Sequence, residues 1–444
     1  MTGNPRPDRL DGAAIDAGVW HRLLQGGTSR RTVLKVAAAG AASAGAADGR
    51  GVSAAAQGEP GTPVARNGHY HDIVQKLVDL IDQYGWEADF EQAIRTAQAF
   101  DVPSIRDIQA LDDYLRFIND LVTWTPRQQG DTRRIYDRAV EFYFFLDQEP
   151  VRSLQNPIEP GSGPQELTPL SDWIVEYANA WGSYLDTVES AAEIDSFRND
   201  PAFNWDEYMP PPSGYFTFNQ FFARHTKPGA RPVAAPTDDS IIVSPGDSTF
   251  VGAWPISERS EIYVKDNEID VKGILWSIEE LLYGSAYADR FKGGIFTHSF
   301  LNTFDYHRWH TPVRGEVLEA QVIQGQAWLD VDVQQAIVDG EEVNVLSALD
   351  GTSYQFVQTR GLVVIDSPIG LVACLPIGMA QVSSVVITAE VGKTLSKGEE
   401  LGYFQFGGSD FVMVFERASN AQLITQPDVH HAQGTWVGTA FPAG

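Results

Sequence analysis

Three short segments in the second half of the sequence carry side chains that can act together in catalysis. They place Asp247 in "VSPGDS", His307 and His310 in "DYHRWHTP", and Ser409 in "FGGSD". An aspartate that orients a histidine, and a histidine that takes the proton of a serine hydroxyl, form a triad whose members occur in any chain order. Together the segments predict an activated serine nucleophile.

Each segment also has an ordinary structural interpretation. An Asp after Pro-Gly is typical of a turn. The two histidines of the second segment, with His298 upstream, lack an acidic third ligand at a suitable spacing, and Cys374 is the only cysteine. Neither a metal site nor an internal disulfide is therefore expected. Gly-Gly-Ser is typical of a loop, and Ser409 lacks the G-x-S-x-G motif of hydrolases.

The glycines before Ser409 add a specific possibility. Gly407 and Gly408 have no Cβ, so the backbone can adopt conformations that are closed to other residues. The hydroxyl of Ser409 would then reach the carbonyl carbon of Gly408. The predicted target is the peptide bond of the chain itself.

A predicted helical domain spans residues 59–200. Its apolar residues recur every three or four positions, as in amphipathic helices. Ser104 is predicted to begin one helix and Ser171 to cap another. The aromatic run at 142–145 is interpreted as core rather than as the lining of a pocket.

Residues 201–214 are rich in Pro and Gly and are predicted to be a linker. From 215 to 444, short Val-rich runs separated by Gly, Pro and Asp predict a β domain, with one helix near 277–283. The expected fold class is α+β, with an N-terminal helical domain followed by a predominantly antiparallel β domain that contains few helices.

Charge and the N-terminal residues bear on partners and location. The formal net charge is −27 and the body of the sequence has no basic patch, so nucleic acid is not an expected partner. Residues 1–58 contain a paired arginine, Arg30 and Arg31, before an Ala- and Gly-rich stretch. This pattern predicts export by a twin-arginine signal, and a disordered leader on a cytoplasmic protein is the alternative.

Five further segments carry a resemblance to a known family. In chain order they are "FFARHTKPGARPV" (221–233), "VSPGDS" (243–248), "VKGILWSIEELL" (271–282), "DYHRWHTPVRGEV" (305–317) and "GKTLSKGEELGYFQFGGSD" (392–410). The sequence resembles the phosphatidylserine decarboxylase family of pyruvoyl-dependent decarboxylases, over about 215 to 416.

The resemblance implies self-cleavage between Gly408 and Ser409 into β and α chains. Asp247 would orient His310, and His310 would deprotonate Ser409. An N-to-O acyl shift, β-elimination and loss of ammonia would convert Ser409 into a covalent pyruvoyl group, which forms a Schiff base with a substrate amine and so promotes loss of CO2.

The resemblance also gives His307 a role, and the sequence departs from the family in three places: Ser248 and Ser383 stand where glycine is common, and Asp410 is the third. His307 would handle the proton that replaces the lost carboxylate. Asp410 stands where Ser or Thr is usual, and its charge is expected to act on ester formation or on a substrate carboxylate.

Two substrates fit the expected chemistry. A free amino acid is favoured, with an aromatic side chain suggested by the Trp- and Tyr-rich helical half. Phosphatidylserine, which would require membrane contact, is the alternative. The oligomeric state is left open.

Two other classes of protein also remain. They are a biotin- or lipoyl-carrier-like β module and an exported binding protein with an uncleaved site. Gel electrophoresis under denaturing conditions separates these from an enzyme that releases a fragment of residues 409–444.

Overall fold

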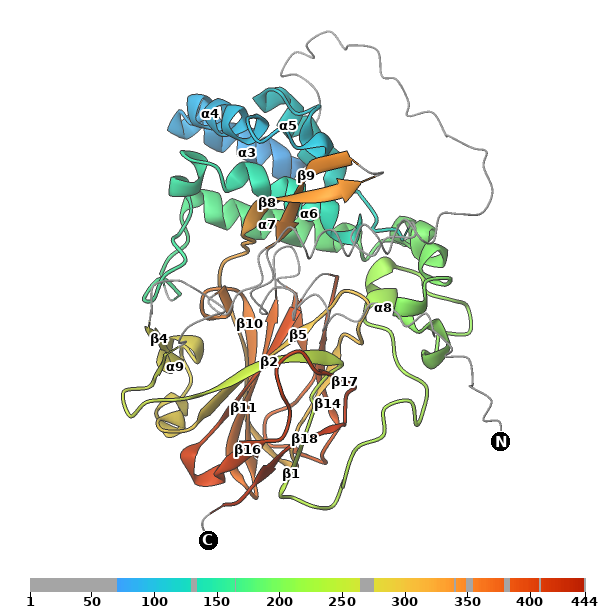
Figure 1. The fold of residues 1–444 in the computed structure, drawn as a ribbon, viewed down its shortest axis with the longest axis vertical. Helices are drawn as coiled ribbons and strands as arrows, with labels where there is room; N and C mark the ends of the chain where they lie inside the picture. The colour runs from blue at the N-terminus through green and yellow to red at the C-terminus, as the bar shows by residue number, and fades with distance from the viewer. Residues whose placement is uncertain are drawn as a thin grey trace, which may run out of the picture.

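The computed structural model describes residues 70–128, 134–163, 165–263, 275–338, 341–348, 354–378, 384–406 and 409–442. The predicted export leader at 1–58 and Gly408, on one side of the predicted cleavage point, lie outside the described residues. A helical region, blue to green in Figure 1, lies at one end of a larger β region.

The helical region is built from amphipathic helices, as the apolar spacing predicts. Its α-helices are α3 (Asp72–Tyr84), α4 (Glu87–Gln98), α5 (Leu111–Leu121), α6 (Arg134–Leu146) and α7 (Pro169–Tyr184), followed by α8 (Phe218–Phe222). Helix α3 buries Val74, Leu77 and Ile81, one face at the predicted spacing. The aromatic run at 142–145 is buried, which confirms its interpretation as core.

Two predicted helix starts were wrong. Ser104 lies in a single 3-10 turn, and α5 begins later, at Leu111. There the carboxylate of Asp113 accepts a hydrogen bond of 3.0 Å from the backbone at the helix start, which satisfies a donor that the first turn leaves unpaired. Helix α7 is capped by Thr168, whose side chain accepts a bond of 3.3 Å from the N–H of Ser171.

The predicted linker contains local structure. Residues 201–203 and 205–207 form 3-10 turns. Phe203 is buried, with its ring 4.8 Å from that of Phe197 and 6.3 Å from that of Phe221. The domain limits at 200 and 215 stay a prediction, because the segment packs with residues on both sides of it.

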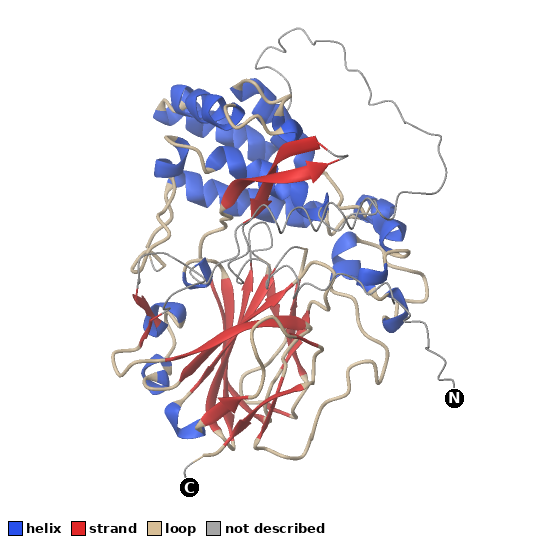
Figure 2. Ribbon diagram, viewed as in Figure 1, coloured by secondary structure: helices blue, strands red, loops and turns tan. Residues whose placement is uncertain are grey.

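The β region is dominated by one eight-stranded sheet, in the order β13-β7-β10-β11-β15-β5-β2-β17 (Figure 2). The described strands are β1 (Ile241–Val243), β2 (Ser248–Pro255), β3 (Glu261–Tyr263), β4 (Leu275–Ser277), β5 (Ile295–Leu301), β6 (Arg308–His310), β7 (Gly315–Ile323), β8 (Val331–Val338), β9 (Glu341–Ala348), β10 (Arg360–Ser367), β11 (Gly370–Gly378), β12 (Val385–Ile387), β13 (Thr394–Leu395), β14 (Glu400–Phe404), β15 (Ser409–Phe415), β16 (Ala421–Leu423), β17 (His430–His431) and β18 (Trp436–Ala440).

Neighbouring strands of the large sheet are antiparallel, and α9 (Ile278–Leu281) forms where one helix was predicted. These features confirm the α+β class. The Val-rich runs recognised in the sequence correspond to β1, β2, β3, β7, β10, β11, β12 and β15, and the other described strands, among them β5, β8 and β9, were not predicted.

The two regions share contacts and a hydrophobic core. The hairpin of β8 and β9, orange in Figure 1, extends from the β region and packs against the helices. The side-chain amide of Asn344 in β9 donates a hydrogen bond of 2.7 Å to the carbonyl of Phe100. The N–H of Val331 donates one of 3.1 Å to the carboxylate of Asp147 at the end of α6. The helical region is therefore packed against one end of the sheet and joined to it by hydrogen bonds.

Candidate active site

Ser409 begins β15, a strand in the interior of the large sheet. It pairs with Gly378 of β11 on one side and with Leu301 of β5 on the other. Because β15 is enclosed on both faces, its apolar run is buried throughout. Ser409 is fully buried, and its Oγ has no hydrogen-bond partner among the described residues. A buried hydroxyl without a partner is costly, which is typical of functional sites.

His307 is a second buried polar group of this kind. It is 0% exposed, and neither ring nitrogen has a hydrogen-bond partner in the described parts of the chain. Its ring lies 3.9 Å from the ring of Phe222 in α8. Burial, together with the positive charge of Arg224, holds the pKa of His307 well below the ordinary histidine value. The imidazole is therefore neutral at physiological pH.

His310, at the end of β6, has both ring nitrogens engaged. Nδ1 lies 2.9 Å from the carbonyl oxygen of Gly398, and Nε2 lies 3.1 Å from the hydroxyl of Tyr306. Since a carbonyl only accepts, Nδ1 carries the proton and Nε2 is the acceptor. Burial lowers the pKa of His310. This neutral tautomer is the one in which Nε2 can act as a base.

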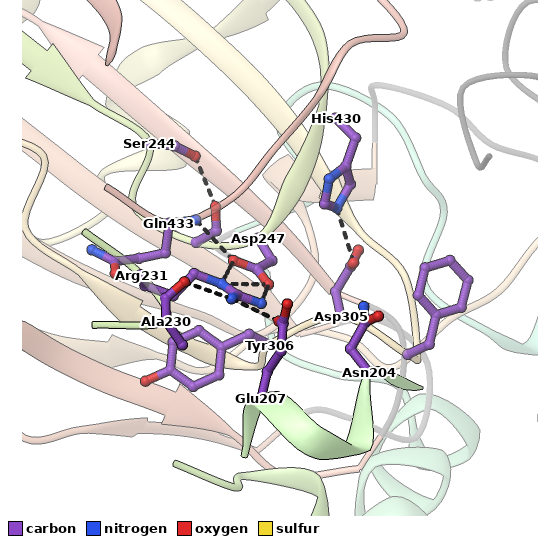
Figure 3. Close-up of polar contacts among 12 residues, drawn as sticks. Asn204, Glu207, Ala230, Arg231, Ser244, Asp247, Asp305, Tyr306, His430 and Gln433 are labelled. Atoms are coloured by element: carbon purple, nitrogen blue, oxygen red, sulfur yellow. Dashed lines mark hydrogen bonds and ion pairs between the residues drawn. The ribbon is translucent and has the colours of Figure 1, made fainter. Parts of the chain in front are cut away.

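Asp247 lies in the turn between β1 and β2, but it does not hold His310. Its carboxylate accepts hydrogen bonds of 2.8 and 3.0 Å from Nε of Arg231 and one of 2.6 Å from Nη2 (Figure 3). It also accepts one of 2.8 Å from the N–H of Gln433. Among the described contacts, the carbonyl of Gly398 occupies the place next to Nδ1 of His310 that was predicted for Asp247.

The reason for this difference is the fork of Arg231, which fits a carboxylate in a bidentate manner. Arg231 also donates a bond of 2.8 Å from Nη1 to Glu207, so Asp247 belongs to a chain of alternating charges. The loop before Asp247 still lies beside His310. The backbone N–H of His310 donates a hydrogen bond of 2.8 Å to the carbonyl of Pro245 in that loop. Burial has the largest effect on the pKa of His310 and lowers it; the carbonyl of Gly398 and the charge of Glu400 raise it, and the charge of Asp247 adds a smaller effect in the same direction.

Asp410 points away from Ser409. Side chains alternate along a strand, so the carboxylate of Asp410 lies on the opposite face of β15. There it is 3.1 Å from Nε2 of His298, and it accepts a hydrogen bond of 2.9 Å from the amide of Gln355. These partners enclose its charge on the face away from the nucleophile. The expected repulsion of a substrate by Asp410 is not supported by this orientation.

Two residues of the site were missed in the sequence. Arg224 is 2% exposed, donates a bond of 2.8 Å from Nη2 to the carbonyl of Phe304, and lies 4.1 Å from the ring centre of Tyr208. It stands inside the quoted "FFARHTKPGARPV" motif, where its position was a usable signal. His298, which the sequence analysis considered only as a metal ligand, is instead a buried partner of Asp410 on β5.

The described part of the chain gives three further results. It contains no group of three or more His, Cys, Asp or Glu side chains arranged to hold a metal ion. None of its helices has the length and apolar character needed to cross a bilayer. Cys374 is buried, and burial raises the pKa of its thiol.

Comparison with known proteins adds a family match. The model of the family described as phosphatidylserine decarboxylase matches residues 218–439. This range contains Asp247, His307, His310 and Ser409, and it leaves out the helices α3 to α7.

Individual relatives match a little over half of the chain. "Phosphatidylserine decarboxylase proenzyme 3" of Schizosaccharomyces pombe is 35% identical over 53% of this chain, which covers 22% of the relative. "Decarboxylase iboD" of Amanita muscaria is 31% identical over 53% of this chain and 74% of the relative. "Phosphatidylserine decarboxylase proenzyme" of Fusobacterium nucleatum is 30% identical over 60% of this chain and 78% of the relative. The chain therefore spans about a fifth of the length of the yeast relative and about three quarters of the other two.

Proposed function

Because the chain belongs to the phosphatidylserine decarboxylase family, as its resemblance indicated, we propose that it is a proenzyme that cleaves itself between Gly408 and Ser409 and then decarboxylates phosphatidylserine. The carboxylate of the serine headgroup leaves as CO2, and a proton takes its place on the same carbon, giving phosphatidylethanolamine. The observation that carries the proposal is the family match, which spans all four predicted site residues.

The surroundings of Ser409 fit the residue from which a pyruvoyl group is made. Its hydroxyl is buried without a partner and follows two glycines, while β11 and β5 hold the strand that it begins. A chain broken before Ser409 would keep its new terminus in the sheet. The pyruvoyl group supplies a carbonyl that condenses with the substrate amine and accepts the electrons released with CO2.

The histidines divide the proton transfers between them. His310 holds its proton on Nδ1 against the carbonyl of Gly398, and its Nε2 would exchange the hydroxyl of Tyr306 for that of Ser409 to act as the base during self-cleavage. His307 is buried and neutral, with ring nitrogens that no described residue engages. We assign to it the proton that replaces the carboxylate. Asp247 contributes negative charge near His310, and Arg231 fixes the place of that charge.

The names of the relatives favour phosphatidylserine over the free amino acid that the sequence analysis preferred. Matched proteins from a yeast, a plant and several bacteria are named phosphatidylserine decarboxylase proenzymes. A free amino acid stays the second candidate, because "Decarboxylase iboD" matches over 74% of its length and its name does not mention a phospholipid.

Two measurements on the purified full-length chain test the proposal. Denaturing electrophoresis with mass analysis should give a fragment of residues 409–444 that begins with a pyruvoyl group. Release of labelled CO2 should then be measured from phosphatidylserine in mixed vesicles and from a panel of free amino acids. Turnover of the vesicles is the expected result. Turnover of an amino acid alone would establish the second candidate, and an unbroken, inactive chain would refute both.

A further inference from the structure

Two points of attachment, at Phe406 and at Ser409, flank the bond that the proposed reaction breaks. Only Gly407 and Gly408 separate Phe406 from Ser409. Because glycine constrains the backbone least, the position of the Gly408 carbonyl depends on how firmly the residues on either side are held. On the downstream side, Ser409 is held in the sheet between Gly378 and Leu301.

The upstream side is held by the helical region. The N–H of Phe406 donates a hydrogen bond of 3.2 Å to Oδ1 of Asn219 in α8. Asn219 is 2% exposed, and its Nδ2 donates bonds of 3.1 Å to the carbonyl of Gly182 and 3.0 Å to the carboxylate of Asp186. Gly182 lies in the last turn of α7, and Asp186 lies two residues past the end of that helix. The amide of Asn219 thus links the end of α7 to the backbone just before the cleavage point.

An aromatic socket surrounds the side chain of Phe406. Its ring centre lies 5.3 Å from that of Trp181 in α7, 5.3 Å from that of Phe218 and 5.5 Å from that of Phe222 in α8. Trp181, Phe218 and Phe222 are each 1% exposed. Since Phe222 also packs on His307, the same short helix contacts both the segment before the cleavage point and a proposed catalytic residue.

A cavity next to this link does not change the argument. About 150 Å³ is enclosed between α7, α8 and residues 405–406. The amide of Asn219 faces it, but both of its polar atoms are already used by protein partners. The cavity therefore leaves space beside residues 405–406. The hydrogen bond from Phe406 to Asn219 limits how far Phe406 can move into that space.

We propose that Asn219 is a positioning residue for self-cleavage, and that α7 and α8 serve the reaction by holding Phe406 through it. The inference rests on the proposed self-cleavage at Ser409. Loss of the link lets the residues before the cleavage point move relative to Ser409. Since small displacements of reacting groups cost large factors in rate, Asn219→Ala should slow self-cleavage by about tenfold to about a hundredfold.

A matched control separates positioning from loss of stability. Asn156 is also a buried asparagine of the helical region, and it is 6% exposed. Its Oδ1 accepts a bond of 2.7 Å from the N–H of Thr168, and its Nδ2 donates one of 3.0 Å to the carbonyl of Glu166. Asn156→Ala removes equivalent hydrogen bonds far from Phe406. It should lower the melting temperature about as much as Asn219→Ala does and leave the rate of self-cleavage unchanged.

A pair of substitutions tests the hydrogen-bond pattern itself. Asn219→Asp keeps an acceptor for the N–H of Phe406 but places two carboxylates about 3 Å apart, a spacing that favours protonation of one of them. Its self-cleavage should be slow at pH 8 and recover as the pH falls, which Asn219→Ala should not do. Combining Asn219→Asp with Asp186→Asn exchanges donor and acceptor across this one contact and should restore part of the rate at pH 8, because the carbonyl of Gly182 still lacks its donor.

The experiment follows the uncleaved fraction of the full-length chain against time after cell-free synthesis, with melting temperatures measured for each variant. A folded Asn219→Ala chain that cleaves at the wild-type rate would overturn the inference. Equal slowing by Asn156→Ala, or no rescue in the exchanged pair, would also overturn it. If the wild-type chain itself never cleaves, the proposed function fails first, and that failure is visible before any variant is compared.

Discussion

The carboxylate of Asp410, the residue that directly follows Ser409, lies 3.1 Å from Nε2 of His298 in the interior of the protein. His298 is in β5 and pairs with Val412 of β15, so the contact crosses two adjacent strands on the face away from Ser409. The amide of Gln355 binds the other carboxylate oxygen. The contact therefore fixes the first residues after the proposed cleavage point without entering the nucleophile's side of the sheet.

Breaking this contact should destabilise the fold. In the uncleavable Ser409→Ala background, His298→Ala leaves a buried charge without its ring partner, which should lower the free energy of unfolding by about 3–5 kcal/mol. Adding Asp410→Asn removes the charge and should recover part of the loss. Urea unfolding measures both. The exposed pair of Asp289 and Lys292 is the control, and Asp289→Asn should have no measurable effect. Additive losses from the two buried substitutions would contradict the coupling.

The hydroxyl of Ser409 should matter for chemistry and not for stability. Ser409→Ala should leave one unbroken chain with no decarboxylation, while its free energy of unfolding stays within about 0.5 kcal/mol of the intact proenzyme because no hydrogen bond is lost. Ser419 is the control, because its buried hydroxyl, unlike that of Ser409, donates a hydrogen bond of 2.7 Å to the carbonyl of Glu416. Ser419→Ala should lose about 1 kcal/mol and still be cleaved. Cleavage of the Ser409→Ala chain would exclude Ser409 as the nucleophile of self-cleavage.

Substitutions of His307 and His310 should affect different steps, decarboxylation and self-cleavage respectively. His307→Gln should permit self-cleavage but reduce turnover per cleaved chain by about 10²- to 10⁴-fold, because the proton donor is lost. His310→Gln should slow cleavage itself. Electrophoresis measures the cleaved fraction, and labelled CO2 measures turnover normalised to that fraction. The assignment is wrong if His307→Gln blocks cleavage while cleaved molecules retain full turnover.

The acid limb of self-cleavage should reflect His310. A base works only when it is unprotonated, and burial lowers the pKa of His310 from its ordinary value of 6.5. The rate should therefore be level through neutral pH and decline only at a midpoint below 6.5. Timed cleavage in a series of buffers gives this midpoint. A midpoint above 6.5 would show that another group limits the reaction or that His310 is charged.

Glu141 should give the helical region a pH-dependent stability. Burial raises the pKa of Glu141 from 4.5 to about 7, against the lowering effect of Arg138. The folded state thus prefers the protonated carboxyl, so this contribution is complete below pH 4.5 and is lost as the pH rises through 7. Between pH 5 and 8 the free energy of unfolding of the wild type should fall by about 2–3 kcal/mol more than that of Glu141→Gln. Equal losses in the two proteins would contradict the raised pKa.

Local patterns in the sequence predicted the buried faces of α3, α5 and α7 and the Val-rich strands such as β10, β11 and β15. The spacing of Val74, Leu77 and Ile81 is enough to fix the buried face of α3, because a helix repeats every 3.6 residues. Helix starts were less predictable. A serine after a proline satisfies the local rule, yet residues 103–105 form only one turn and α5 begins at Leu111, where Asp113 supplies the bond to the backbone.

For the site, the sequence predicted which residues would carry the chemistry, because motif order and residue type are local properties of the chain. It did not determine their partners. Arg231 and Asp247 are sixteen positions apart, His298 and Asp410 come from different strands, and Asn219 and Phe406 come from different regions of the chain. Which side chain meets which carboxylate or backbone group depends on strand register and on how the helices close over the sheet. These are long-range packing outcomes, and only the tertiary structure decides them.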